Sequence, residues 1–155
     1  MKFIRYRDGY AYQLAVDYEI NVPILPDREV EEAFIKLDRA GNLRILDGYA
    51  WDGPSGPALD TPNFMRGSLV HDALYQLLRD ELIPQRYRQV ADNVLRQLCR
   101  EDGMSGFRAW YTYHAVRIFA KDAADPASRK PILQAPRSAG EMPGYTDQNG
   151  SGAAQ

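Results

Sequence analysis

The sequence predicts an α+β fold, in which a small N-terminal antiparallel β unit precedes three helices and an extended C-terminal tail. Apolar and polar residues alternate in the first third of the chain, and apolar residues recur at helical spacing in the middle. Proline and glycine accumulate near the end. With 155 residues, 45% of them hydrophobic, the chain suffices for one domain. We expect that domain over residues 1–125, with the β unit in 1–50, the helices in 61–121 and the tail in 126–155.

The β unit is predicted from a period of two, which is typical of a strand with one buried face. A first strand is expected over residues 10–24, and a hairpin follows, with strands at 34–38 and 43–47 around a turn at 39–42. The apolar positions of the first strand are Tyr10, Tyr12, Leu14, Val16, Tyr18, Ile20, Val22 and Ile24.

Three helices are predicted after this unit. The first covers about residues 63–79, because Thr61 is a suitable N-cap and Pro62 suits the first helical position. The second covers about 85–101, and the third covers 107–119. The third carries the clearest amphipathic pattern, so we expect its apolar face to be buried. That face consists of Phe107, Trp110, Tyr111, His114, Ala115, Ile118 and Phe119.

Two expectations concern polar residues of the helices. His114 is predicted to be a hydrogen-bonded core histidine, with a zinc site shared with His71 as the alternative. Four basic residues are predicted to form a solvated helix face, with a patch for phosphate or lipid head groups as the alternative. They are Arg100, Arg108, Arg117 and Lys121.

The composition argues against several classes of protein. With 19 basic and 21 acidic residues the formal net charge is −2, whereas general nucleic-acid binders are normally basic. One cysteine excludes a disulfide framework and a Cys-rich zinc site. No apolar run approaches the roughly 18 residues of a membrane span, and the N-terminus lacks the apolar core of a signal peptide. We expect a soluble protein of the cytoplasm, with no nucleic-acid partner.

The residues with the most chemical potential lie on the first helix. His71 and Tyr75 are four residues apart and share one face, whereas Asp72 is rotated by about 100° to one side. Adjacent helical residues cannot easily bond to each other, so His71 and Asp72 can serve two tasks, one as a base and the other as a metal ligand. The alternative is a polar pair at the helix edge. Tyr75 can equally be a core aromatic residue with a satisfied hydroxyl.

A histidine base needs a partner that fixes its tautomer, usually a carboxylate. Asp92 is the best candidate, because an antiparallel hairpin that turns around Ile83 and Pro84 would bring it back across His71. The alternative is an Asp92 that faces solvent and pairs with Arg96, four residues on.

These residues resemble a known core. The segment 70–75, Val-His-Asp-Ala-Leu-Tyr, together with Ala-Asp at 91–92, resembles the phospholipase A2 superfamily, in which a His-Asp-x-x-Tyr helix packs against a second helix with an aspartate. The wider pattern of residues 48–119 looks like a family of tailed phages and prophages that carries an HDxLY helix.

The phospholipase resemblance implies a role for each matching residue. His71 would be the general base, Asp92 would orient it, and Tyr75 would bond to Asp92. Asp72 would bind Ca²⁺, together with backbone carbonyls of the loop from Trp51 to Gly56. The carbonyls of Trp51, Gly53, Ser55 and Gly56 are the candidates.

The loop departs from the family pattern. It contains Pro54 and Pro57 in place of a glycine-richer sequence, and prolines restrict which carbonyls can converge. A rigid turn between sheet and helix is therefore an equal alternative.

Two functions follow from these observations. The first is a phage- or prophage-type hydrolase of phospholipid or other esters that depends on Ca²⁺. The second is a virion or accessory protein that keeps the helical hairpin as a scaffold. In the second, residues 126–155, which have four prolines and four glycines, would bind a virion partner or another copy of the chain.

Overall fold

The computed structural model describes residues 4–6, 12–53, 61–129 and 133–135. It divides the chain into two units. In the smaller unit, Met1–Asp8 with Lys130–Gln155, strand β1 (Ile4–Tyr6) pairs antiparallel with β8 (Leu133–Ala135). The larger unit, Gly9–Arg129, contains every other described element and confirms the predicted α+β class.

A four-stranded antiparallel sheet forms the β part of the larger unit, with the strand order β3-β6-β5-β4. The two short strands β2 and β7 pair separately. The tight turn between β5 and β6 depends on Asp38, whose carboxylate accepts hydrogen bonds from the backbone of Ala40 and Asn42, and on Gly41 at a φ of +84°. The strands are β2 (Tyr12–Gln13), β3 (Tyr18–Asn21), β4 (Val30–Glu32), β5 (Ile35–Leu37), β6 (Asn42–Ile45) and β7 (Ala50–Trp51).

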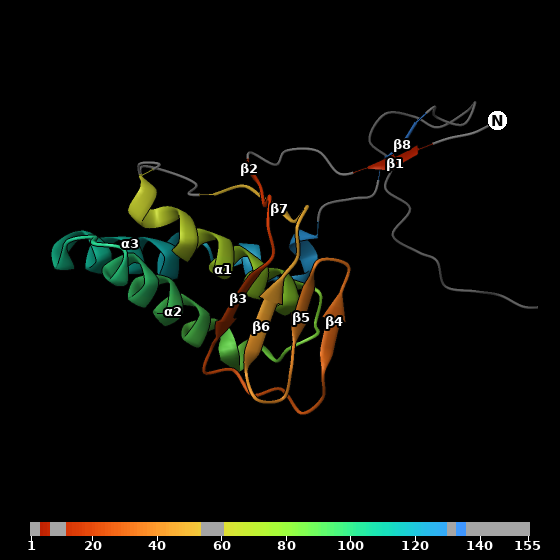
Figure 1. The fold of residues 1–155 in the computed structure, drawn as a ribbon, viewed down its shortest axis with the longest axis horizontal. Helices are drawn as coiled ribbons and strands as arrows, with labels where there is room; N and C mark the ends of the chain where they lie inside the picture. Colours follow the sequence, from red (N-terminus) through yellow and green to blue (C-terminus); the bar gives the residue numbers. More distant parts are fainter. Residues whose placement is uncertain (1–3, 7–11, 54–60, 130–132, 136–155) are drawn as a thin grey trace, which may run out of the picture. The chain divides into compact units, whose positions relative to one another are not determined.

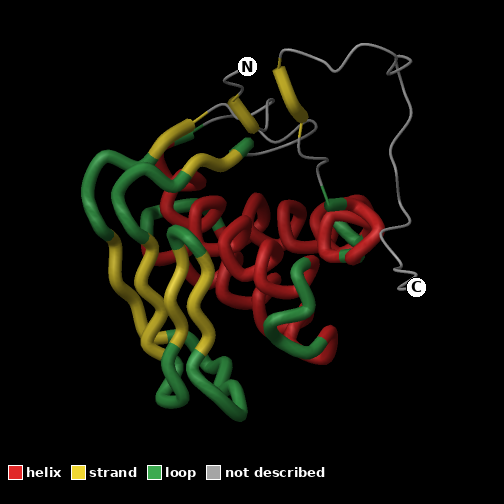
Figure 2. Tube along the Cα trace, turned by 90° about the vertical axis from the view of Figure 1, so that its right-hand side faces the viewer, coloured by secondary structure: helices red, strands yellow, loops and turns green. Residues whose placement is uncertain are grey.

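The helices cover one face of this sheet (Figures 1 and 2). The alternation of the strands explains this arrangement: one parity is buried against the helices and the other stays in solvent. The helical elements are α1 (Pro62–Arg79), η1 (Gln85–Tyr87), α2 (Arg88–Glu101), α3 (Gly106–Phe119), η2 (Asp122–Ala124) and η3 (Pro126–Ser128). The main core consists mostly of residues from the sheet, α1 and α2, including Val22, Ile24, Ile35, Leu37, Leu43, Ile45, Leu74, Leu77, Leu78 and Leu98.

Gly67 lies at a close contact between α1 and α2. A Cβ placed on Gly67 would lie 3.0 Å from Cys99 Sγ and 3.0 Å from Leu95 Cδ1. The absence of a side chain at this position lets the two helices pack tightly. Gly67 is one turn before His71, so this approach also sets the spacing at the candidate site.

Helix α3 is oriented opposite to the prediction. Its packing against α1 and α2 uses Ala109 and the half-buried Val116, which belong to a small cluster separate from the main core. The face that was expected to be buried is turned to solvent, and its exposed residues are Phe107, Trp110, Tyr111, His114 and Ile118. The small inner residue Ala109 allows α3 to pack closely against its neighbours. The same rotation of α3 directs the Arg117 side chain towards Asp92.

Three smaller predictions also need correction. The single strand over residues 10–24 is two strands, β2 and β3, with a break at which Val16 is 73% exposed. The sheet contains an additional strand, β4, that the alternation did not reveal. The second helix begins with a short 3-10 turn over Gln85–Tyr87. The 34–38 and 43–47 hairpin is confirmed as β5 and β6.

The predicted tail of residues 126–155 falls largely outside the described residues. Of its described part, η3 and Arg129 belong to the larger unit, where Arg129 Nε lies 3.0 Å from Asp80 Oδ1. The expectation that this tail is flexible or bound to a partner stays a prediction.

Candidate active site

The Asp92 carboxylate is the centre of a buried polar cluster to which three helices contribute. His71 Nε2 lies 2.9 Å from Asp92 Oδ1, and the Tyr75 hydroxyl donates to the same oxygen at 2.7 Å. The second oxygen, Oδ2, accepts a hydrogen bond from Arg117 Nη1 of α3 at 2.9 Å. The predicted contact between His71 and Asp92 is therefore confirmed.

The helical repeat explains why these groups meet. His71 and Tyr75 are one turn apart on α1, and their rings lie against each other with centroids 3.9 Å apart. Asp92 follows Ala91 on the face of α2 that packs against α1. Asp92 is fully buried, so the alternative of a solvent-facing Asp92 paired with Arg96 is wrong.

A second layer of hydrogen bonds holds the first. Arg88 Nε donates to the Tyr75 hydroxyl oxygen at 3.2 Å, and Arg88 Nη2 donates to the backbone carbonyl of Arg117 at 2.8 Å. Among the described residues, every buried side-chain nitrogen and oxygen has a hydrogen-bond partner. The carboxylate is thus buried with full compensation, as a buried charge requires.

These contacts shift the pKa values of the cluster. Burial raises the pKa of Asp92, but the hydrogen bonds from His71, Tyr75 and Arg117 outweigh it and hold that pKa below the usual value. Burial lowers the pKa of His71, whereas the neighbouring Asp72 and Asp92 carboxylates raise it, and the net pKa lies above 6.5. Burial and the Asp92 charge raise the pKa of Tyr75, so it remains a neutral donor.

The other ring nitrogen of His71 faces a different environment. His71 Nδ1 lies 3.8 Å from Asp72 Oδ1, beyond hydrogen-bond distance, and the Asp72 side chain is 29% exposed. With Nε2–H donated to Asp92, Nδ1 carries the lone pair of the neutral ring. This nitrogen, next to a partly exposed carboxylate, is the atom of the cluster that can take a proton from water.

The predicted calcium ligands are only partly described. Trp51 is buried, and its indole Nε1 lies 3.3 Å from Ser68 Oγ, one turn before His71. Gly53 has a φ of +71° and lies against the ring of Tyr12. Ser55 and Gly56 lie outside the described residues. Within the described part of the chain, no group of three His, Cys, Asp or Glu residues is arranged to hold a metal ion.

Other predicted features lie away from this cluster. His114 is exposed rather than buried, and its ring centroid lies 4.5 Å from that of Trp110. The core-histidine prediction is therefore wrong. Cys99 is buried, and burial raises the pKa of its thiol to about 11, so it is not a thiolate nucleophile.

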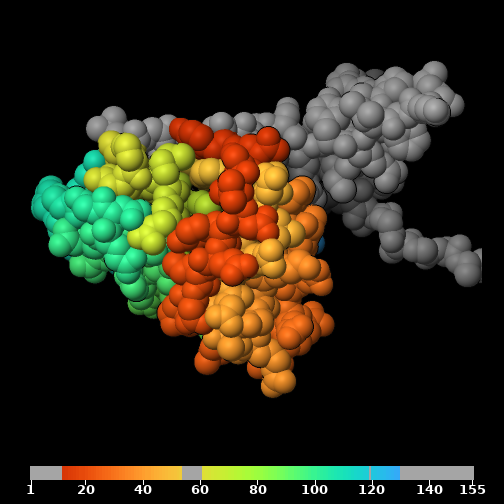
Figure 3. Space-filling model, in the orientation of Figure 1, coloured from red at the N-terminus to blue at the C-terminus, as the bar shows by residue number. Residues whose placement is uncertain are grey.

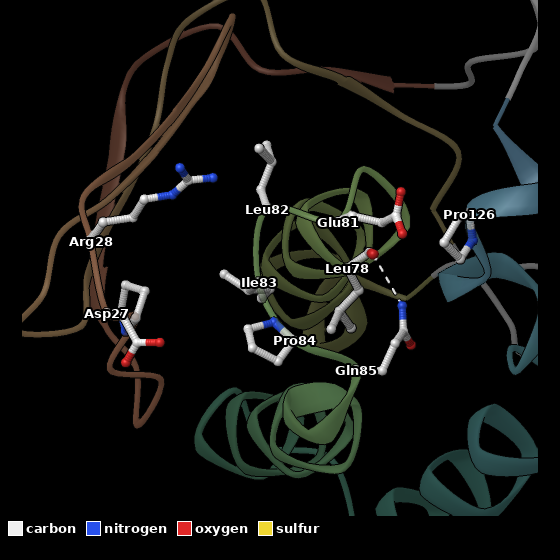
Figure 4. A pocket seen from close by; sticks show the side chains of 10 residues that line it. Asp27, Arg28, Leu78, Glu81, Leu82, Ile83, Pro84, Gln85 and Pro126 are labelled. Atoms are coloured by element: carbon white, nitrogen blue, oxygen red, sulfur yellow. Dashed lines mark hydrogen bonds between the residues drawn. The ribbon is translucent and has the colours of Figure 1, made fainter.

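A hollow of about 440 Å³ lies at the C-terminal end of α1 (Figure 4). Its wall includes Leu78, Ile83 and Pro84, together with Asp27 and Arg28 from the sheet side. Leu78 is seven residues beyond His71, which is about 10 Å along a helix. None of the residues of the cluster lines this hollow, so it is not part of the candidate site.

Two members of the cluster were missed by the sequence analysis. The helical pattern places Arg117 on a solvated face and gives Arg88 no role. A hydroxyl donor is neutral, so a buried carboxylate still needs a positive charge nearby. This requirement is the signal that could have pointed to arginines on the neighbouring helices. Helical spacing alone could not select them, because it does not give the rotation of α3.

No helix in the described part of the chain is long and apolar enough to cross a membrane. Comparison of the chain with protein-family models, with curated proteins and with solved structures gives no match.

Proposed function

We propose that the protein hydrolyses carboxylic esters, with phospholipids as the substrate class and His71 as the general base. The observation that supports this proposal most is the hydrogen bond between His71 Nε2 and the fully buried Asp92, which leaves Nδ1 for catalysis. A carboxylate behind the imidazole fixes the ring orientation and the tautomer, and it stabilises the imidazolium that forms during the reaction.

The proposed reaction consumes only water and an ester. His71 Nδ1 takes a proton from a water molecule while the water oxygen attacks the ester carbonyl carbon. The tetrahedral intermediate then collapses, the carbon–oxygen bond to the alcohol breaks, and the imidazolium returns its proton to the leaving alkoxide. The products are a carboxylic acid and an alcohol. Asp92, held by Tyr75 and Arg117, keeps the ring in place throughout.

A calcium ion is part of the proposal. Asp72 is the described residue that could hold it, because its carboxylate is partly exposed and lies beside His71 Nδ1. Oxygen ligands are those that Ca²⁺ prefers, and backbone carbonyls of the loop that includes Trp51 and Gly53 would complete the set. When bound, the ion would polarise the ester carbonyl.

A phage or prophage setting remains part of this proposal, on the resemblance of residues 48–119. The protein would then act in the host cytoplasm or as part of a virion.

The alternative is a non-catalytic virion or accessory protein that uses the same hairpin as a scaffold. One observation favours it: His71 is only 6% exposed, and both oxygens of the Asp92 carboxylate that it contacts already have hydrogen-bond donors. Such a cluster can rigidify a fold without performing chemistry.

The test compares two histidine variants. His71→Gln should abolish hydrolysis of a water-soluble short-chain ester, whereas His114→Gln, at the other histidine of the chain, should leave it unchanged. Loss of the base removes a contribution of roughly 10²–10⁴-fold. Titration of released acid measures the rate, with Ca²⁺ and with EDTA.

Thermal melting of both variants is the control for folding. If the wild-type protein releases no acid from short-chain esters or phospholipids at any calcium concentration, the hydrolase proposal fails and the scaffold alternative remains.

A further inference from the structure

The outer face of α3 carries an aromatic stripe that no described residue covers. We define this stripe as Phe107, Trp110, Tyr111 and Ile118, which are 79%, 48%, 48% and 68% exposed. The rings of Phe107 and Trp110 stack with centroids 6.2 Å apart at the N-terminal end of the stripe. Four large apolar side chains on one face exceed the scattered exposed residues of an ordinary surface.

Positive charges flank the stripe. Helix α3 contains no acidic residue, and Arg108 and Arg117 lie on either side of the stripe on the helical wheel. The neighbouring helix α2 adds the exposed Arg96 and Arg100. The two acidic residues of α2 do not add negative charge to this surface, because Asp92 is buried within the site and Glu101 pairs with Arg66. Arg117 offsets the charge of Asp92, so the positive charge of this region comes from the exposed Arg96 and Arg100 of α2.

This combination selects among occupants. A second copy of the chain, packed stripe against stripe about a two-fold axis, would bring two copies of α3 together, and neither copy has an acidic residue on that helix to pair with the arginines around the stripe. An anionic lipid surface meets both requirements, because aromatic rings with polar edges settle at the head-group level and arginines bind the phosphates.

We propose that the aromatic stripe of α3, with its flanking arginines, docks the protein on anionic phospholipid bilayers. The helix would lie in the plane of the interface, with Phe107 and Ile118 inserted and Trp110 at the head groups. Docking of this kind does not require hydrolysis. That the docked lipid is also the substrate rests on the proposed function.

The test uses the full chain, EDTA, and vesicles of phosphatidylcholine with or without phosphatidylserine. The wild-type protein should co-sediment with the phosphatidylserine vesicles and at least tenfold less with phosphatidylcholine alone. The double variant Phe107→Ser/Ile118→Ser should bind at least tenfold more weakly. Val16→Ser is the matched control, because Val16 is 73% exposed on the sheet side, and it should bind like the wild type.

Trp110 gives an independent readout, since the chain has only one other tryptophan, the buried Trp51. Binding should shift the fluorescence of Trp110 to the blue, and raised salt should reverse the shift. The inference is overturned if no vesicle binds the wild type, if the double variant and Val16→Ser bind alike, or if the double variant instead dissociates a dimer seen by sedimentation velocity without lipid.

The two proposals fail separately. His71→Gln should co-sediment with phosphatidylserine vesicles like the wild type, because docking needs no catalysis. Vesicle binding by a wild-type protein that hydrolyses no ester would leave the docking inference standing without the proposed function. Ester hydrolysis without vesicle binding would support the proposed function and overturn the docking inference.

Discussion

The sheet half of the larger unit, residues 12–51, and its helical half, residues 61–129, divide charge and burial differently. In the sheet half the buried residues are apolar, and its eight acidic residues outnumber its four basic ones. The helical half buries an aspartate and a histidine, and it exposes four large apolar side chains on α3. Figure 3 shows the two halves as adjoining regions of the surface, the strands in red to orange and the helices in yellow-green to teal.

The difference is informative because folding alone rewards apolar burial and polar exposure. The sheet half buries no charged side chain, and its exposed large apolar residues, Val16, Leu25 and Phe34, lie in the connections between its strands. The helical half breaks the rule in two places, the Asp92 cluster and the aromatic stripe. At Asp92 the buried charge is fully compensated by hydrogen bonds, whereas on α3 the exposed apolar side chains have no compensating contact among the described residues. We therefore look for function at these two places.

The largest effect expected is from Asp92→Ala. It leaves His71, Tyr75 and Arg117 without their shared acceptor, and breaking a buried ion pair typically costs about 3–5 kcal/mol. Asp17→Ala in the sheet half removes an exposed pair with Arg44 and a hydrogen bond from the Asp47 backbone, and it should change the free energy of unfolding far less. Urea unfolding of both variants measures the contrast. Equal losses would mean that the two halves do not differ as proposed.

A smaller loss is expected from Gly67→Ala. The added methyl group would press on Cys99 and on Leu95, and overpacking costs about 1–3 kcal/mol, against a gain of roughly 1 kcal/mol in helix propensity. The control is Gly106→Ala at the start of α3, where the nearest atom to the added carbon would be Arg100 Nη1 at 3.8 Å. A Gly67→Ala protein as stable as the control would show that α1 and α2 can separate without cost.

Stability near neutral pH should depend on pH mainly through the helical half, because both histidines lie there. The pKa of His71 is raised in the folded state, so its stabilisation is complete below pH 6.5 and is lost as the pH rises through the higher folded value. The pKa of Asp92 is lowered, so its stabilisation is present above pH 3.8 and is lost as the pH falls through the folded value.

The His71–Asp92 pair should therefore contribute most between these two limits. Urea unfolding in EDTA at a series of pH values should show wild type exceeding His71→Gln by the largest margin near pH 5 to 6, with the margin narrowing above pH 6.5. A margin that grows with pH would mean that His71 is stabilised as the neutral ring.

Much of this fold could be predicted from local patterns. The hairpin of β5 and β6 and the extents of α1 and α2 were predicted to within a few residues, because alternation, an N-terminal proline and helical spacing are local signals. The meeting of His71 and Asp92 could be predicted as well, since a short turn at Pro84 forces the two helices to run antiparallel.

The rotation of α3 could not be predicted in this way. Its amphipathic pattern favours burying the aromatic face, whereas the structure buries Ala109 and Thr112 and directs Arg117 to Asp92. That choice depends on a charge requirement of a distant carboxylate, which no local window contains. The break at Val16 is similar, since an apolar residue at the correct parity carries no sign that the strand stops pairing there.

The acceptor at Asp92 makes three separate stretches of the chain interdependent. Its donors come from α1 and α3, at positions that are 17 to 25 residues distant in sequence. A substitution at any one of these positions leaves a buried charge or donor without its partner. Relatives of this chain should therefore either keep all of these residues or replace them together. A lineage that has replaced Asp92 by a nonpolar residue should also have lost the guanidinium at 117, so an alignment of relatives is a genetic test of the cluster.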